Sequence, residues 1–436
     1  MKIHDFLEID YALLLSSALL TVFGILFIYS SSVTTFGVSV SSEYLRQVFW
    51  GAGGLVIALV IAMLNYRRIY YASSYMYLGA LVLLIYTCLF GRVVNGARAW
   101  LGIGSFGIQP SEFAKLTTII FLARFLDSTK NSRSDAWRFI VSCTIVFTPM
   151  LIILMQPDFG TSLVFIAILI VMMFISGISM RYIIFLMLIL IFTGLLLVLP
   201  LWQTHILGKI IPFLSILSNK RFIIVAIAAL LIIFFMALAG YLRYKKAYFY
   251  WIGYGVVSIG VSLCISFAGQ KVLKPYQIMR LIVFLDPDID PRGSGWNIIQ
   301  SITAIGSGGI LGKGYLQGTQ SHYRFLPQQS TDFIFSIYSE EWGFLGGVIV
   351  FLLFLLIIMR LVKIMKTISD PFGCYIIAGL AGMYIFHFMI NVGMTMGIMP
   401  ITGIPLLFMS YGGSALTTAM TGIGLALSIH IRRFQY

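Results

Sequence analysis

Three aspartates stand within five positions in the stretch FLDPDIDPRGSGWN, which spans residues 284–297. They are Asp286, Asp288 and Asp290, in a chain of 436 residues that has only 15 acidic ones. The Asp-Pro pairs keep Asp286 and Asp290 extended, and the glycines that follow permit a tight turn. A carboxylate displayed in this way suits a general base or a ligand for a divalent cation. The alternative is a solvated turn held by local hydrogen bonds.

Other ionisable residues lie inside or beside apolar segments, where burial of a charge is costly. Glu112 and Lys115 are three residues apart on one helical face, so they can form an ion pair that serves either packing or function. Asp158 stands where one apolar run ends and the next begins. It can cap the following helix or take part in a site.

Glu340 and Glu341 fall early in an apolar helix that Thr331 or Asp332 could cap. Adjacent residues do not share a helical face, so at least one carboxylate should point into a cavity or at a partner.

The glycine-rich stretch 305–320 contains Lys313 but fails the GxxxxGK[ST] test for a nucleotide loop, because position 307 is Ser and position 314 is Gly. A backbone cradle for an anionic group and a flexible loop both remain open for it.

Composition indicates which elements position these residues. The chain is 60% hydrophobic and 10% charged, with a mean hydropathy of +0.98, so we expect an all-α polytopic membrane protein. The apolar runs predict about twelve helical spans in one membrane domain covering residues 1–436. They lie near 11–30, 48–64, 74–90, 112–126, 139–155, 162–179, 182–200, 222–240, 248–268, 333–359, 372–393 and 405–430.

Basic residues in the short loops favour the side of both termini, which predicts cytoplasmic termini. Two long polar segments, 91–116 and about 270–332, then lie outside the cell, and we expect the second to fold onto the membrane face. The net charge of +14 suggests anionic lipid headgroups as partners rather than nucleic acid, because the basic residues flank spans. The scattered cysteines and histidines predict no metal site or catalytic triad, and His387 is expected to be a packed helix residue.

Five long segments, in chain order, resemble the signature sequences of the SEDS family (RodA, FtsW and SpoVE), the polytopic peptidoglycan polymerases of bacteria. They are NGARAW…QPSEFAKL at 95–116, QPDFGTSLV at 156–164, DPRGSGWNIIQSITAIGSGGILGKGYLQGTQ at 290–320, FLPQQSTDFIFSIYSEEWGFLG at 325–346 and GMTMGIMPITGIPLLFMSYGGSA at 393–415. The stretches AIGSGG and TGIPL are more similar to the elongation branch, RodA, than to the division branch, FtsW.

The resemblance implies a glycosyltransferase that uses lipid II, an undecaprenyl-diphosphate-linked disaccharide pentapeptide, as donor and acceptor during cell elongation. Such chemistry needs a base for the attacking hydroxyl and positive charge for the departing diphosphate. The position that matches the family's essential aspartate is Asp290. A divalent cation, Mg or Mn, is also implied, with Asp286 and Asp288 as turn residues or cation ligands.

The same resemblance implies that further residues bind the substrate or support the loop. Trp100, Glu112 and Lys115 would line a central cavity, with Arg98 near phosphate and Asp158 at the outer rim. Lys313, Asp332, Glu340 and Ser414 would support the loop or the substrate. The sequence departs from the family pattern at Trp296-Asn297, Gln328 and Leu407.

The family normally has ten spans, so the segment 202–268 is expected to be a two-helix insertion before the catalytic loop at 270–332. The implied partners are a class B penicillin-binding protein and the elongation machinery in the bacterial cytoplasmic membrane. A flippase that carries lipid II outward is the rival hypothesis, since buried charges and many helices also suit a transporter. A non-catalytic scaffold is a third. The concentration of carboxylates on the outer face favours the enzyme.

Overall fold

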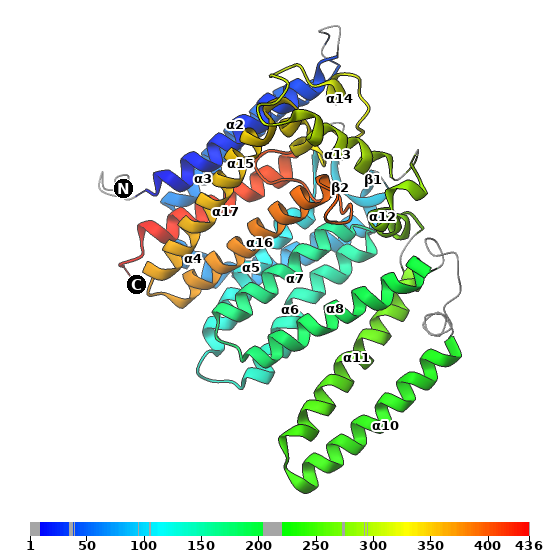
Figure 1. Cartoon of the computed structure of the whole chain (residues 1–436). Coiled ribbons are helices and arrows are strands. Elements are labelled where there is room, and N and C mark those ends of the chain that lie inside the picture. Colours follow the sequence, from blue (N-terminus) through cyan, green and yellow to red (C-terminus); the bar gives the residue numbers. More distant parts are fainter. Residues whose placement is uncertain are drawn as a thin grey trace. The chain divides into compact units, whose positions relative to one another are not determined.

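The structure is a computed structural model that describes residues 9–34, 38, 40–94, 96–103, 106–203, 220–272, 275–291, 293 and 295–435. The chain divides into two compact units (Figure 1). The first consists of Met1–Ile178 and Gln300–Tyr436, and the second of Ser179–Ile299. Each unit is described by itself.

The first unit is a bundle of helices. They are α2 (Tyr11–Ser32), α3 (Glu43–Met63), α4 (Arg67–Phe90), α5 (Pro110–Thr129), α6 (Asp135–Met155), α7 (Phe159–Ile175), α14 (Thr319–His322), α15 (Ile334–Thr367), α16 (Pro371–Thr395) and α17 (Gly413–Ile431). Helix α13 (Trp296–Gly308) crosses the boundary between the units. The second unit contains α8 (Met180–Trp202), α10 (Lys220–Tyr244), α11 (Ala247–Val272), α12 (Pro275–Leu285) and the 3₁₀ turn η3 (Pro287–Ile289).

The predicted polytopic helical architecture is confirmed. Within the described residues, ten helices are long and apolar enough to cross a membrane. Two further predicted spans correspond to α5, which carries the Glu112–Lys115 pair, and to α7, which has 17 residues. The count of twelve spans stays a prediction.

Helices α16 and α17 form the most enclosed part of the bundle. In their most apolar stretches, 67% and 83% of the residues are buried. Helix α16 packs against α5, α7 and α15, and α17 packs against α3. At one end of the bundle, Arg360 near the end of α15 forms an ion pair of 2.6 Å with Asp10 before α2. Arg432 after α17 donates to the carbonyl of Met63 at the end of α3. Figure 1 shows the start of α2 and the end of α17 at this same end of the bundle.

A three-stranded antiparallel sheet, not predicted from the sequence, leads into α5. Its strands are β1 (Arg92–Val94), β2 (Ala97–Ile103) and β3 (Phe106–Ile108). Gly96, at the connection between β1 and β2, has a φ of +83°. An Asn-Gly pair between two short apolar runs is a strong hairpin signal that could have revealed the sheet.

The predicted span 405–430 begins too early. Helix α17 starts at Gly413, and residues 401–412 before it are non-helical yet mostly buried, with Leu406 and Met409 both at 0% exposure. Non-helical backbone is tolerated at membrane depth only where protein satisfies its polar groups. Here Asn391 of α16 donates to the carbonyl of Ile404 at 2.8 Å, and Gln47 of α3 donates to that of Ser410 at 3.0 Å.

In the second unit, α10 and α11 pack together as a hairpin, and α11 also packs against α8. Tyr254 donates to the carbonyl of Arg181 at 2.7 Å, and Ser262 to that of Ile189 at 3.2 Å. Both contacts join residues 73 apart in the chain, so α8 and α11 run parallel. The helices predicted at 222–240 and 248–268 are thus present. That 202–268 is an insertion stays a prediction.

Candidate active site

Asp290 ends the 3₁₀ turn η3 and begins the glycine turn. Its carbonyl accepts the amides of Gly293 at 3.2 Å and Gly295 at 3.0 Å, which folds the chain back on itself. A Cβ on Gly293 would collide with the Asp290 carboxylate oxygens, and a Cβ on Gly295 would collide with the Pro287 carbonyl. The half-buried carboxylate therefore lies directly over the glycine turn, and the glycines make the room that it occupies.

Asp286 shapes the same turn by accepting the amide of Asp288 at 3.1 Å, as the local-bonding alternative for these aspartates predicts. Among the described residues, no three His, Cys, Asp or Glu side chains form a metal-binding group. Mg²⁺ commonly uses one or two carboxylates together with substrate phosphates and water. The exposed Asp288 and the half-buried Asp286 fit that kind of ligand set.

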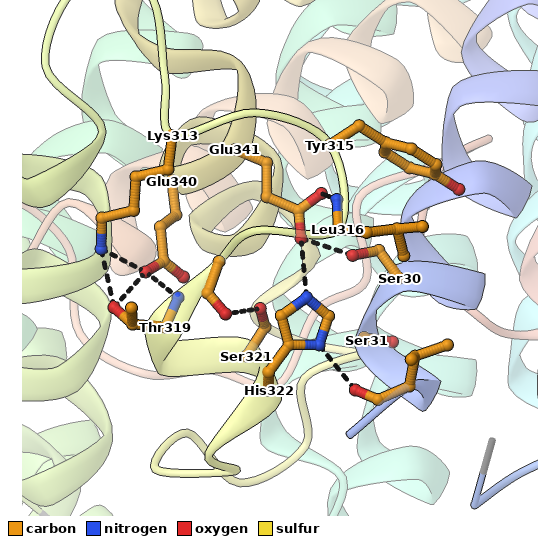
Figure 2. A network of polar contacts seen from close by, with 12 residues as sticks. Ser30, Ser31, Lys313, Tyr315, Leu316, Thr319, Ser321, His322, Glu340 and Glu341 are labelled. Carbon is orange, nitrogen blue, oxygen red and sulfur yellow. Dashed lines mark hydrogen bonds and ion pairs between the residues drawn. The ribbon is translucent and has the colours of Figure 1, made fainter. Parts of the chain in front are cut away.

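Glu340 organises the glycine-rich segment in the first unit (Figure 2). One carboxylate oxygen, Oε1, accepts from Lys313 Nζ at 2.7 Å and from the amides of Thr319 and Gln320 at 2.8 and 3.0 Å. Glu340 is fully buried, whereas the Lys313 side chain is 25% exposed. The carboxylate thus holds Lys313 and the start of α14 to α15.

Glu341 fixes the same segment to α2. Its carboxylate accepts from the hydroxyl of Ser30 and from the amide of Leu316, the latter at 3.0 Å. His322 Nδ1 donates to the Val33 carbonyl at 2.6 Å, and its Nε2 lies 3.9 Å from Glu341 Oε1. Burial, reinforced by the Glu341 charge, raises the pKa of Tyr315 to about 12. Both adjacent acids therefore point at the loop.

Glycines allow the backbone of this loop to lie against α15. Helix α15 is interrupted at Gly343, where φ is +65°, and a Cβ on Gly312 would collide with the Glu341 carbonyl. The amides of Lys313 and Gly314 donate to the carbonyls of Glu340 and Glu341 at 3.1 and 3.0 Å. These amides are engaged by protein, so the contacts favour a structural role for the stretch over an anion cradle.

A buried polar triad joins α5 to α16. Lys115 Nζ lies 2.8 Å from Glu112 Oε1 and 3.0 Å from His387 Nε2. Because an ammonium can only donate, Nε2 accepts, and Nδ1 of His387 donates to the Pro405 carbonyl at 3.0 Å. Glu112 Oε2 is buried and has no hydrogen-bond partner in the described part of the chain. His387 is packed as predicted, but its bond to Lys115 was not foreseen.

The sheet, α7 and α17 meet around Gln109. Asp158 caps α7 by accepting the Thr161 amide at 3.1 Å, as its capping alternative predicts, and it also accepts from Gln109 Nε2 at 2.8 Å. The amide of Gln109 donates to Ser414 Oγ at 2.9 Å. These bonds tie Gln109, at the start of α5, to the starts of α7 and α17, so Asp158 and Ser414 position it.

The remaining predicted residues lie on the sheet and before α15. Trp100 on β2 packs its ring over Gly107 on β3, and the Arg98 guanidinium donates to the Leu89 carbonyl at 3.3 Å. The Asp332 carbonyl accepts from Asn391 at 3.0 Å.

Among the departures from the family pattern, Leu407 is buried, and the carbonyl of Gln328 accepts the Asp332 amide at 3.2 Å. Asn297 lies in α13.

The structure thus gathers the predicted residues into separate groups. The Asp286–Asp290 turn belongs to the second unit, and the other predicted residues belong to the first. Sequence reasoning missed Ser30, His322 and His387 as members of polar networks. The position of His387 inside an apolar run was the one sequence signal for a buried polar contact. Ser30 and His322 gave no such signal, and their partners are hundreds of residues away in the chain.

Comparison with known proteins decides the family. The family described as "Cell cycle protein", FtsW/RodA/SpoVE, matches residues 11–221 and 202–435. The chain belongs to this family, the SEDS family. It is similar to the peptidoglycan glycosyltransferase RodA of Treponema pallidum (strain Nichols), with 49% identity over 99% of this chain and 100% of that protein. The peptidoglycan glycosyltransferase MrdB of Escherichia coli (strain K12) is 32% identical over 98% of this chain and 95% of its own.

Solved structures of the family agree in fold. One of them is a chain of a peptidoglycan synthase complex that coordinates polymerization and crosslinking. It aligns with this chain with a TM-score of 0.68 and 26% identity. The alignment covers 98% of this chain and 99% of that one. The SEDS prediction is confirmed, and the curated names do not favour the flippase alternative.

Proposed function

We propose that this SEDS protein is a peptidoglycan glycosyltransferase that polymerises lipid II into glycan strands during cell elongation. The relatives similar over nearly their whole length carry that activity in their names. The observation that carries the proposal is the Asp290 carboxylate held over the Gly293 turn by a backbone that folds back on its own carbonyl.

In this mechanism Asp290 accepts the proton of the acceptor's GlcNAc 4-hydroxyl. The hydroxyl oxygen forms a bond to the anomeric carbon of the donor's MurNAc, while the bond from that carbon to the lipid diphosphate breaks with inversion. The diphosphate leaves with the electron pair of the broken bond. Asp290 suits the role of general base because its carboxylate is only half-buried. A substrate hydroxyl can therefore donate a hydrogen bond to it.

We propose Asp286 and Asp288 as the residues that would hold a divalent cation, Mg²⁺ or Mn²⁺, with phosphate oxygens completing its shell. Such a cation would supply positive charge to the departing diphosphate.

For residues of the first unit we propose roles in substrate binding that follow from the family resemblance. The unpartnered Oε2 of Glu112 is an acceptor available to a substrate hydroxyl or amide, while Lys115 binds the other oxygen of that carboxylate. Trp100 offers an aromatic face, and Arg98 a cation for phosphate. Lys313, Asp332 and Glu340 are proposed to hold the segment before α15 in place, and Asp158 and Ser414 the outer segment 91–116.

The protein is a multi-pass membrane protein, and we propose the cytoplasmic membrane with both termini in the cytoplasm. Support comes from the basic short loops and from the shared side of the α2 start and the α17 end. The acidic turn would then face outward. The related synthase complex supports a partner that crosslinks strands, for which we propose a class B penicillin-binding protein of the elongation machinery.

The test is glycan formation from purified lipid II, resolved on a gel, for the wild type and Asp290→Asn with and without the transpeptidase partner. Polymer from the wild type and none from a folded Asp290→Asn supports the proposal. If neither forms polymer while the wild type moves labelled lipid II across vesicles, the protein is a transporter. If folded Asp290→Asn polymerises normally, Asp290 is not the base.

A further inference from the structure

The tip of the α10–α11 hairpin combines basic and aromatic side chains in a way that no part of the proposed reaction uses. The sequence YLRYKKAYFYWIGY, residues 241–254, contains three basic residues and seven aromatic ones with no acid. Residues 241–248 are all exposed. The tip is therefore a concentrated patch of positive charge among rings.

No acidic residue in α8, α10, α11 or α12 balances this charge. The sequence has neither Asp nor Glu between Asp158 and Asp286, so the helices of the second unit carry none. The bond from Tyr254 to the Arg181 carbonyl brings the start of α8, with its exposed Arg181, to the same end as the tip. Four cations therefore gather at this end of the unit: Arg181, Arg243, Lys245 and Lys246.

The lengths of the two helices put the tip at a bilayer surface. Helix α10 has 25 residues and α11 has 26, which corresponds to about 38 Å each at about 1.5 Å per residue. Both are apolar enough to span about 30 Å of hydrocarbon. The turn between them thus lies at headgroup level, where Tyr and Trp rings prefer to sit.

Local packing keeps the tip compact. Phe249 packs on Gly240, where a Cβ would lie 2.5 Å from its ring, and it stacks on Tyr244 with an interplanar angle of 20°. Lys245 adopts the left-handed conformation, with φ of 50°, and its amide donates to the Tyr241 carbonyl at 2.8 Å. This geometry turns the chain sharply with the charged side chains left exposed.

We propose that the hairpin tip binds the headgroups of anionic phospholipids in the leaflet that it faces. The cations would pair with phosphate groups, and Tyr241, Tyr244, Tyr248 and Trp251, all exposed, would insert at the interface. The site is separate from the proposed transferase chemistry and does not depend on it.

Trp251 provides a direct readout. The full-length protein is reconstituted in phosphatidylcholine vesicles containing a small fraction of brominated phosphatidylglycerol or brominated phosphatidylcholine, and fluorescence quenching is measured. Subtraction of Trp251→Phe isolates the signal of this residue. We expect phosphatidylglycerol to quench Trp251 more strongly than phosphatidylcholine at equal fraction. Equal quenching by the two lipids overturns the proposal.

Charge variants test whether the tip itself is responsible. Lys245→Asn with Lys246→Gln removes two charges, and Asn tolerates the left-handed conformation at 245. The matched control is Lys363→Gln with Lys366→Gln, which removes two exposed charges near the end of α15, also on the predicted cytoplasmic side.

We expect each charge removed at the tip to lower the preference for phosphatidylglycerol about fivefold, the equivalent of about 1 kcal/mol per basic side chain. The control pair should leave quenching of Trp251 unchanged. An equal loss in both variants would indicate attraction by overall charge and overturns the proposal. Circular dichroism of each variant shows whether the fold is retained.

Discussion

The two acidic clusters of the molecule differ in what surrounds their carboxylates. Glu340 and Glu341 are fully buried, and their oxygens accept from a lysine, a serine and backbone amides of the segment 313–320. Asp290 is half-buried, and its carboxylate lies over the glycine turn at the surface of the second unit's acidic segment. The buried glutamates hold the segment 313–320 to α2 and α15, whereas we propose that the carboxylate on the turn takes the proton of the reacting hydroxyl.

Asp290→Asn is expected to have the largest effect on activity. An amide cannot accept the hydroxyl proton, and loss of a general base typically costs about 100- to 10,000-fold in rate. We expect this loss with an unchanged unfolding temperature, measured by polymerisation kinetics and thermal melting. Asp135→Asn, a partly exposed residue at the start of α6, is the matched control and should change the rate by less than about twofold. A melting point lowered in parallel with the rate would make Asp290 a structural residue.

Glu340→Ala should show the opposite pattern. It strands the amides of Thr319 and Gln320 and leaves Lys313 unpaired, so we expect about 3 kcal/mol of lost stability. Denaturant unfolding in detergent measures the change. Lys313→Met removes a partly exposed partner and should cost only about 1 kcal/mol. Equal costs for the two substitutions would contradict the assignment of Glu340 as the anchor.

Gly293→Ala tests whether the position of the Asp290 carboxylate matters for the rate. The new methyl group would collide with the flexible end of Asp290 and displace its carboxylate, and a shift of about 1 Å can cost about 100-fold in rate. We expect a loss of about 10- to 100-fold with the fold intact. Kinetics that match the wild type would show that the carboxylate can move aside at no cost.

Asp158 lies between the two extremes, since it caps α7 and also accepts from Gln109. Asp158→Ala should lower stability by about 1 kcal/mol, the usual cost of a lost helix cap. Asp158→Ser keeps a capping oxygen and should recover most of that loss in the same thermal measurement. If Asp158→Ser is as unstable as Asp158→Ala, the bond to Gln109 matters more than the cap.

Local chemistry explains what the sequence could predict. The spans follow from long apolar runs, and the Asp290 turn follows from Asp-Pro pairs and glycines within a few residues. The helix cap at Asp158 was likewise predictable from the sequence. The Asn-Gly pair in the sequence also signals a β-hairpin, and this signal was overlooked.

The rest depends on contacts between residues far apart in the chain. Ser30 meets Glu341 across 311 residues, and Lys115 meets His387 across 272. No spacing rule connects such pairs in a single sequence. The start of α17 was misplaced for a related reason, because residues 404–412 are apolar enough for a helix but take their hydrogen bonds from side chains of α3 and α16.

That non-helical segment bears on biogenesis. Its carbonyls find their donors on Gln47, His387 and Asn391, all of which are synthesised earlier. The segment cannot settle in hydrocarbon until those helices have assembled around it. Assembly of the first unit therefore finishes only when its carboxyl-terminal part has been made, and a ribosome that stalls before α17 leaves α3 without the helix that packs against it.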